Sequence, residues 1–147
     1  MSTSPKNPIP WALIRVMVGT VFLSEGIQKF LYPAELGAGR FARIGIPWPQ
    51  GMAPFVGVVE ILGGLLILAN LLVPYAATAL LINISVAVIS TKIPILLGRS
   101  LAIFSLPKLS SYGFWTFLHE ARTDWCMLLG CLALILLART PPRYSLR

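Results

Sequence analysis

Four long apolar stretches run along the chain, separated by short segments rich in proline, glycine or charged residues. Each stretch has roughly the 20 residues that an α-helix needs to cross a bilayer core. Pro8 and Pro10 precede the first stretch, and the breaker-rich sequence GIPWPQGMAP precedes the second. The pattern therefore predicts four membrane-spanning helices, at about residues 11–30, 53–73, 75–93 and 122–138.

The connections between these helices carry distinct signals. The sequence NLLVPY predicts a tight turn after the second helix, and Pro94 is expected to kink or end the third. Residues 94–111 are apolar but too broken to cross, so they either dip into the membrane or lie on it. The cluster of Phe114, Trp115, Phe117 and Leu118 beside polar residues predicts an aromatic interfacial helix ahead of the fourth span. The fourth span is short enough to require tilt or local thinning of the bilayer.

The composition supports a membrane protein. Of 147 residues, 56% are hydrophobic and only 12% are charged, which lies far from the balance of soluble domains. We therefore expect an all-α, four-helix transmembrane bundle that forms a single domain over residues 1–147. The first apolar run is too long for a cleaved signal peptide, and no small-x-small cleavage site follows it.

The net charge of +7 comes from bases at helix ends and in loops. This placement is typical of topology signals and lipid-headgroup contacts, so the expected partner is the lipid bilayer and not nucleic acid. Four crossings put both termini on one side of the membrane, here called the terminal side, and the other is called the loop side. The bases nearly balance. The terminal side has Lys6, Arg139, Arg143 and Arg147, with Arg15 near its surface, and the loop side has Arg40, Arg43, Arg99 and Lys108, with further bases at helix ends. We expect cytoplasmic termini in the inner membrane.

The two cysteines, Cys126 and Cys131, fall in the last apolar run. On a helix their side chains point about 140° apart, so they cannot form a disulfide with each other. The chain has no CxxC sequence, which counts against a thiol-redox enzyme. We interpret both cysteines as small apolar residues.

Ionisable residues within the predicted helices collect toward the loop side. Glu60 lies deepest, roughly 10 Å from the start of its helix, and is too short to reach the surface. An ionised group near the bilayer centre costs about 2.5 to 3.5 kcal/mol, so it is expected to face the bundle interior and to be paired. The resulting set, predicted to bind a ligand or relay protons, is Glu25, Lys29, Glu60, Lys92, His119, Glu120, Arg122 and Asp124.

Two structural alternatives stand beside this hypothesis. Glu25 and Lys29 can pair locally at i, i+4, while Lys92 and Arg122 extend to the membrane surface. Alternatively, the whole set is an ion network that fixes helix register. His119 is most simply an interfacial hydrogen-bonding residue. No metal site is predicted, because Glu120 and Asp124 supply only one i, i+4 pair.

Small residues at helical spacing indicate where helices pack closely. Arg15, Gly19, Gly26 and Lys29 lie along one seam of the first helix, and Gly57 and Gly64 share a face of the second with Glu60. An asparagine in the middle of the third helix suits an interhelical hydrogen bond. The residues predicted to serve packing are Arg15, Gly19, Gly26, Gly57, Gly64 and Asn83.

Several segments together resemble the DoxX-like family of four-helix inner-membrane proteins. They are LIRVMVGTVFLSEGIQKF, GIPWP, VGVVEILGGLLIL, HEARTDWCMLLGCLALILL and the tail RYSLR, and they cover nearly the whole chain. The tail departs from the family's usual Ser-Leu-Asp ending, which puts a role for a terminal carboxylate in doubt. By position, the recurrent polar residues of the family match Arg15, Glu25, Lys29, Glu60, His119, Glu120, Arg122 and Asp124.

The resemblance implies a membrane location and a link to redox chemistry. The family takes its name from a small membrane subunit associated with an archaeal thiosulfate:quinone oxidoreductase, and other members resemble partners in membrane redox complexes. One hypothesis is therefore a subunit whose loop-side pocket binds a quinone, with electrons supplied by a soluble redox partner. A second is a non-enzymatic anchor or assembly factor. A third is a small-solute or proton transporter, which the lack of an inverted repeat disfavours unless the chain forms a homo-oligomer.

Overall fold

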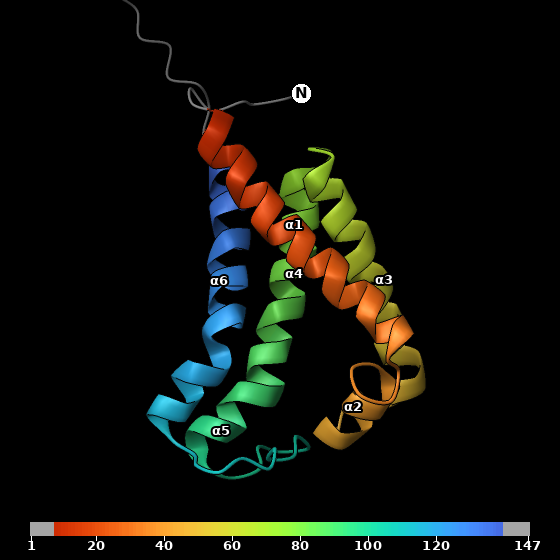
Figure 1. The fold of residues 1–147 in the computed structure, drawn as a ribbon, viewed down its shortest axis with the longest axis vertical. Coiled ribbons are helices and arrows are strands. Elements are labelled where there is room, and N and C mark those ends of the chain that lie inside the picture. The colour runs from red at the N-terminus through yellow and green to blue at the C-terminus, as the bar shows by residue number, and fades with distance from the viewer. Residues whose placement is uncertain (1–7, 140–147) are drawn as a thin grey trace, which may run out of the picture.

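A computed structural model describes residues 8–139, and these residues form a helical bundle (Figure 1). Within them, the one β-pairing is an isolated bridge between Leu101 and Phe104. Four helical stretches are long and apolar enough to cross a membrane, which confirms the predicted fold class. The elements are α1 (Pro8–Leu31), α2 (Ala38–Ile44), α3 (Pro49–Leu68), α4 (Val73–Ala87), the π-helix η1 (Val88–Lys92), α5 (Ile93–Leu97) and α6 (Phe114–Arg139).

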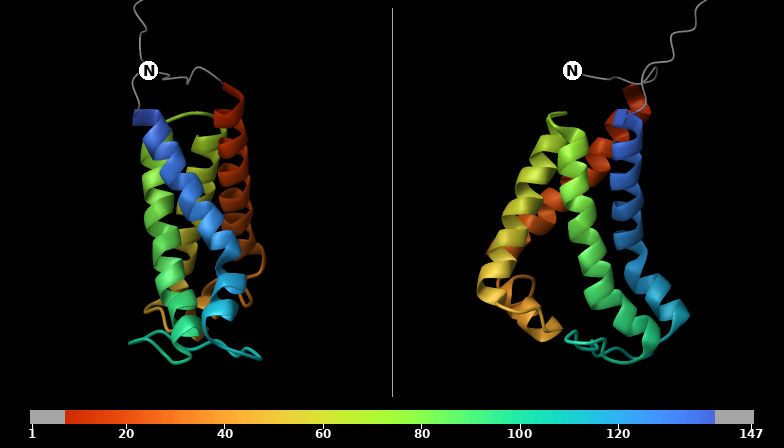
Figure 2. Two further views of the ribbon diagram at one scale, coloured as in Figure 1. Left: turned by 90° about the vertical axis from the view of Figure 1, so that its left-hand side faces the viewer. Right: turned by 180° about the vertical axis from the view of Figure 1, so that it is seen from behind.

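The long helices alternate in direction. The start of α1, the end of α6 and the turn between α3 and α4 all lie on the terminal side, whereas α2 and residues 98–113 lie on the loop side (Figure 1). Helix α1 packs mainly on α3, and α4 packs mainly on α6. The two pairs separate toward the loop side, as the view from behind shows (Figure 2).

Glycines allow α1 and α3 to approach closely. A Cβ added to Gly64 would lie 2.8 Å from the carbonyl oxygen of Gly19, and one added to Gly26 would lie 2.7 Å from that of Gly57. Both distances are shorter than a carbon–oxygen contact tolerates, so side chains at these positions would push the backbones apart. The two glycines lie seven positions apart on each helix, and the two close contacts fix how α1 crosses α3.

The terminal side of the bundle is tightly packed. Val18, Ile67 and Leu80 are fully buried in one apolar cluster that joins all four spanning helices. The Arg15 guanidinium donates hydrogen bonds to the carbonyl oxygens of Ile67 and Leu68 at 2.8 and 2.6 Å. These are among the last carbonyls of α3, which have no partner within their own helix. Arg15 therefore joins α1 to the end of α3.

The second and third spans differ in extent from the prediction. Helix α3 ends at Leu68 because the turn to α4 places Asn70 and Leu72 at positive φ, 58° and 48°. The third span does not end at residue 93 but continues through Pro94 to Leu97. A proline ring in a regular α-helix clashes with the carbonyl four residues earlier, and the π-helical turn just before Pro94 widens the helix at that point.

The fourth span is also longer than predicted. Helix α6 is continuous over Phe114–Arg139, so the aromatic residues form its first turns and not a separate interfacial helix. Residues 98–113 run across the loop-side end of the bundle in every view (Figures 1 and 2). Lys6, the tail RYSLR and its bases lie outside the described residues.

Candidate functional site

Three helices meet at the carboxylate of Glu60. This α3 residue is only 5% exposed. Its Oε2 accepts a hydrogen bond from the Lys29 ammonium of α1 at 2.5 Å, and its Oε1 accepts one from the Asn83 amide of α4 at 2.8 Å. A charge placed this deep needs such partners, because an uncompensated one would carry its full desolvation cost.

The bond between Lys29 and Glu60 replaces the local pairing considered from sequence. Lys29 contacts Glu25 only through the backbone carbonyl oxygen of that residue, at 3.4 Å. Its ammonium can reach α3 because the close contact at Gly26 and Gly57, near Lys29, holds the two helices together. Asn83, assigned to packing from sequence, makes its interhelical bond to Glu60 itself.

A second ion pair joins the π-helical turn to α6. The Lys92 ammonium lies 3.5 Å from Oδ2 of Asp124, and both side chains are mostly buried. The first ion pair binds α1 to α3, and this one binds η1 to α6. The first ion pair therefore lies on the helix pair α1 and α3, and the second lies on the helix pair α4 and α6, with η1 continuing α4. These two helix pairs separate toward the loop side. π-Helical turns within α-helices occur frequently at functional sites.

A cavity of about 810 Å³, here called the central cavity, lies between these two helix pairs. This volume lies in the range of small-molecule pockets. Both ion pairs line it, together with the carboxylates of Glu25 and Glu120. Apolar side chains from the spanning helices, α2 and the loops supply much of the remaining wall: Phe22, Phe41, Trp48, Met52, Ile84, Phe104 and Met127.

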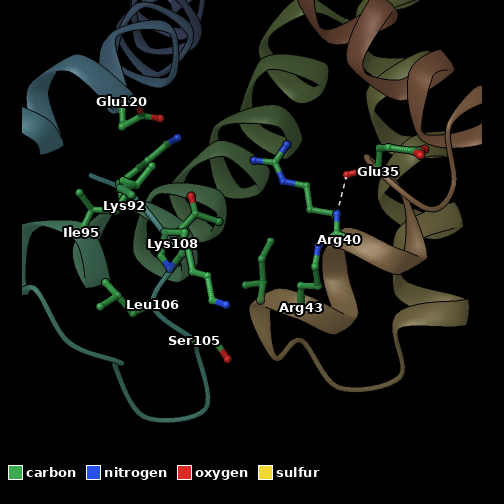
Figure 3. Close-up of a pocket in the computed structure, with 13 residues that line it drawn as sticks. Glu35, Arg40, Arg43, Lys92, Ile95, Ser105, Leu106, Lys108 and Glu120 are labelled. Carbon is green, nitrogen blue, oxygen red and sulfur yellow. Dashed lines mark hydrogen bonds between the residues drawn. The ribbon is translucent and has the colours of Figure 1, made fainter. Parts of the chain in front are cut away.

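A neighbouring hollow of about 630 Å³, here called the end cavity, lies between α2, the end of the third span and residues 105–109 (Figure 3). The two cavities share Arg40, Thr91, Lys92 and Glu120 among their lining residues, so they adjoin. Arg43 lines the end cavity and donates hydrogen bonds to the carbonyl oxygens of Ala34 and Glu35 at 3.0 and 3.1 Å.

Comparison with known proteins now places this arrangement in a family. The sequence model of the DoxX family matches residues 11–93, which is more than half of the chain. The chain belongs to the DoxX family. The match includes Glu25, Lys29, Glu60, Asn83 and Lys92 and ends before α6.

A relative in Mycobacterium tuberculosis is described as an uncharacterized membrane protein. It is 49% identical over 133 residues, which cover 90% of this chain and 76% of the relative. No solved structure matches the chain. Family membership and four apolar helices make this DoxX protein a multi-pass integral membrane protein whose helices contact lipid.

Two residues of the predicted set lie apart from the rest. His119 and Arg122 are exposed and line neither cavity, and the Arg122 guanidinium donates to the His119 carbonyl oxygen of its own helix. Glu120 and Asp124 are four residues apart and share the inward face of α6. His119 and Arg122 are rotated from that face by about 100° or more, so they point elsewhere.

Sequence reasoning missed several residues that line the cavities. Arg40, Arg43 and Lys108 were counted only as topology signals, and Trp48 was not considered. Trp48 precedes α3 with a positive φ of 50°, a conformation that costs free energy in a bulky residue. The available signal was the even number of crossings, which brings both base-containing loops to one side of the membrane.

Proposed function

We propose that this DoxX protein is a membrane subunit of a quinone-linked redox system, and that its central cavity binds the quinone headgroup. The observation that carries the proposal is the hydrogen-bonded group of Lys29, Glu60 and Asn83 beside apolar and aromatic walls. A quinone combines a polar ring with an apolar tail, and this cavity offers a matching surface to each.

The chemistry of the lining suits that ligand. Quinone oxygens accept hydrogen bonds, which the Lys29 ammonium and the Asn83 amide can donate. Reduction to a quinol consumes two protons and two electrons, and carboxylates such as Glu60 can exchange protons. The electrons would come from a separate soluble redox protein, so this chain's own part is to bind the quinone and deliver protons.

The alternative functions fit the structure less well. A transporter needs a path across the membrane, but the terminal side of the bundle is filled by the apolar cluster around Ile67 and Leu80. An anchor for a soluble partner finds some support in the exposed rings of Phe114 and Trp115 at the start of α6. That role would leave the buried group around Glu60 without a purpose beyond stability.

The test is to purify the protein in mild detergent, extract it with organic solvent and quantify quinone by chromatography. We expect bound quinone in the wild type and a drop of about tenfold in Glu60→Gln, which removes one charge-assisted interaction. His119→Gln is the matched control and should retain quinone. Absence of quinone from the wild type, or equal content in folded Glu60→Gln, would contradict the proposal.

For the orientation we propose cytoplasmic termini in the inner membrane, so that the central cavity opens toward the periplasm or cell exterior. The counted bases are divided almost evenly between the two sides, so the orientation is tested by direct measurement. Fusions of the C-terminus to a reporter active only in the cytoplasm and to one active only outside it will decide. Activity of the external reporter alone would reverse the assignment.

A further inference from the structure

The end cavity gathers more positive than negative charge. Four bases line it, Arg40, Arg43, Lys92 and Lys108, against the two acids Glu35 and Glu120. Lys92 is paired with Asp124, and Arg43 is bound to backbone carbonyls. Two cations, Arg40 and Lys108, thus remain without a hydrogen bond or ion pair to any side chain or carbonyl of residues 8–139.

These bases come from separate segments and surround one hollow (Figure 3). Arg40 is on α2, Lys92 ends η1, and Lys108 lies in the connection to α6. Apolar side chains such as Ile44, Ile95 and others share the wall. A cleft of one dominant charge with walls of low polarity focuses its field, so a positive potential builds up there.

We propose that the end cavity is a binding site for a phosphate group, carried either by the headgroup of an anionic phospholipid or by free phosphate. The planar guanidinium of Arg40 can bond two phosphate oxygens at once, and Lys108 adds a compact charge. The site lies on the loop side, at the ends of spanning helices, where basic pockets meet lipid headgroups. This goes beyond the proposed quinone site and does not depend on it.

Lys108 is the most informative residue for a test. It lines the end cavity alone, whereas Arg40 and Lys92 line both cavities. Arg99 is the matched control, because it is an exposed base on the same side of the bundle that lines neither cavity. A loss confined to Lys108→Gln therefore reports on this site and not on surface charge in general.

The experiment measures binding to delipidated full-length protein in neutral detergent. The probes are phosphatidylglycerol, phosphatidylcholine as the zwitterionic control, and inorganic phosphate against chloride at equal ionic strength. Native mass spectrometry counts retained lipid, and thermal unfolding reports stabilisation by either probe. We expect phosphatidylglycerol or phosphate to stabilise the protein. The apparent affinity for that probe should fall about tenfold in Lys108→Gln and Arg40→Gln and stay unchanged in Arg99→Gln.

The outcomes separate the two sources. Binding of phosphatidylglycerol without an effect of inorganic phosphate assigns the site to a lipid headgroup, and an effect of inorganic phosphate assigns it to the free anion. Arg40→Lys, which keeps the charge but loses the guanidinium fork, should show an intermediate loss. Binding of neither probe, or equal weakening by Arg99→Gln, would overturn the proposal. Quinone content should stay normal in Lys108→Gln, so failure of this proposal is distinguishable from failure of the quinone site.

Discussion

The terminal side of the bundle is closed by apolar packing, whereas the loop side is open and charged. On the terminal side, Ile67, Leu80 and Leu134 are fully buried between the helices. On the loop side, the pair α1 and α3 separates from the pair α4 and α6 (Figure 2). The two adjoining cavities lie on this side of the bundle.

This difference indicates that the terminal side and the loop side of the bundle have different roles. A packed apolar half can hold the fold together without the charged residues, which frees the other half to carry polar groups at some cost in stability. Yet α1 and α3 run through both the terminal side and the loop side, and their glycine contacts extend from Gly19 and Gly64 to Gly26 and Gly57. The buried charge of Glu60 thus depends on helix packing that begins in the closed half.

The largest effect on stability is expected from breaking the buried ion pair. Lys29→Met leaves the Glu60 carboxylate with Asn83 as its remaining partner, which should lower the free energy of unfolding by about 3 to 5 kcal/mol. The measurement is unfolding of the purified protein by titration with a denaturing detergent. The double change Lys29→Met with Glu60→Met removes both charges and should recover most of that loss. If Lys29→Met leaves the free energy of unfolding unchanged, the ion pair of Lys29 and Glu60 does not stabilise the loop side.

A smaller effect is expected from widening the helix contact in the closed half. Gly64→Val places a side chain against the backbone of α1, which should cost about 1 to 3 kcal/mol through overpacking. The control is Ala79→Val on the exposed face of α4, which should change stability little in the same titration. Equal stability of the two variants would mean that the close glycine approach is not needed.

The smallest effect is expected from the interhelical hydrogen bond of α4. Asn83→Leu removes one donor to Glu60 but leaves the ion pair with Lys29, so the loss in stability should be about 0.6 kcal/mol, the average for such bonds in membranes. Quinone content should fall measurably even though the loss in stability is small, because the Asn83 amide is a proposed hydrogen-bond donor to the quinone. A large loss of stability with normal quinone content would restrict Asn83 to packing.

The sequence predicted well those features that depend on one helix at a time. The number of spans, the shared side of the start of α1 and the end of α6, and the glycine faces of α1 and α3 follow from length and helical spacing. The inward place of Glu60 follows from the cost of leaving a charge in lipid. Spacing along one helix could not reveal that Lys29 would reach Glu60 on α3 in preference to its neighbour Glu25, because that choice depends on the distance between two helices.

Only some of the polar residues that were predicted to form one site line the same cavity in the structure. Helical position separates Glu120 and Asp124, which line the central cavity, from His119 and Arg122, which do not. The rotation of α6 about its axis decides this, and the low contrast between its faces gave no sequence signal for that rotation. Pro94 marked a disturbance in the third span, but the π-helical turn that positions Lys92 is its structural consequence and was not predicted.

By itself, the sequence determined that this DoxX protein crosses the membrane four times and brings its charged residues to one side, because burial cost and helix length act locally along the chain. Only the tertiary structure decided which charges pair, where the cavities lie, and that Arg40 and Lys108 converge on one hollow. Those outcomes depend on how far α1 and α3 separate from α4 and α6, a distance set by packing between helices that are remote in sequence.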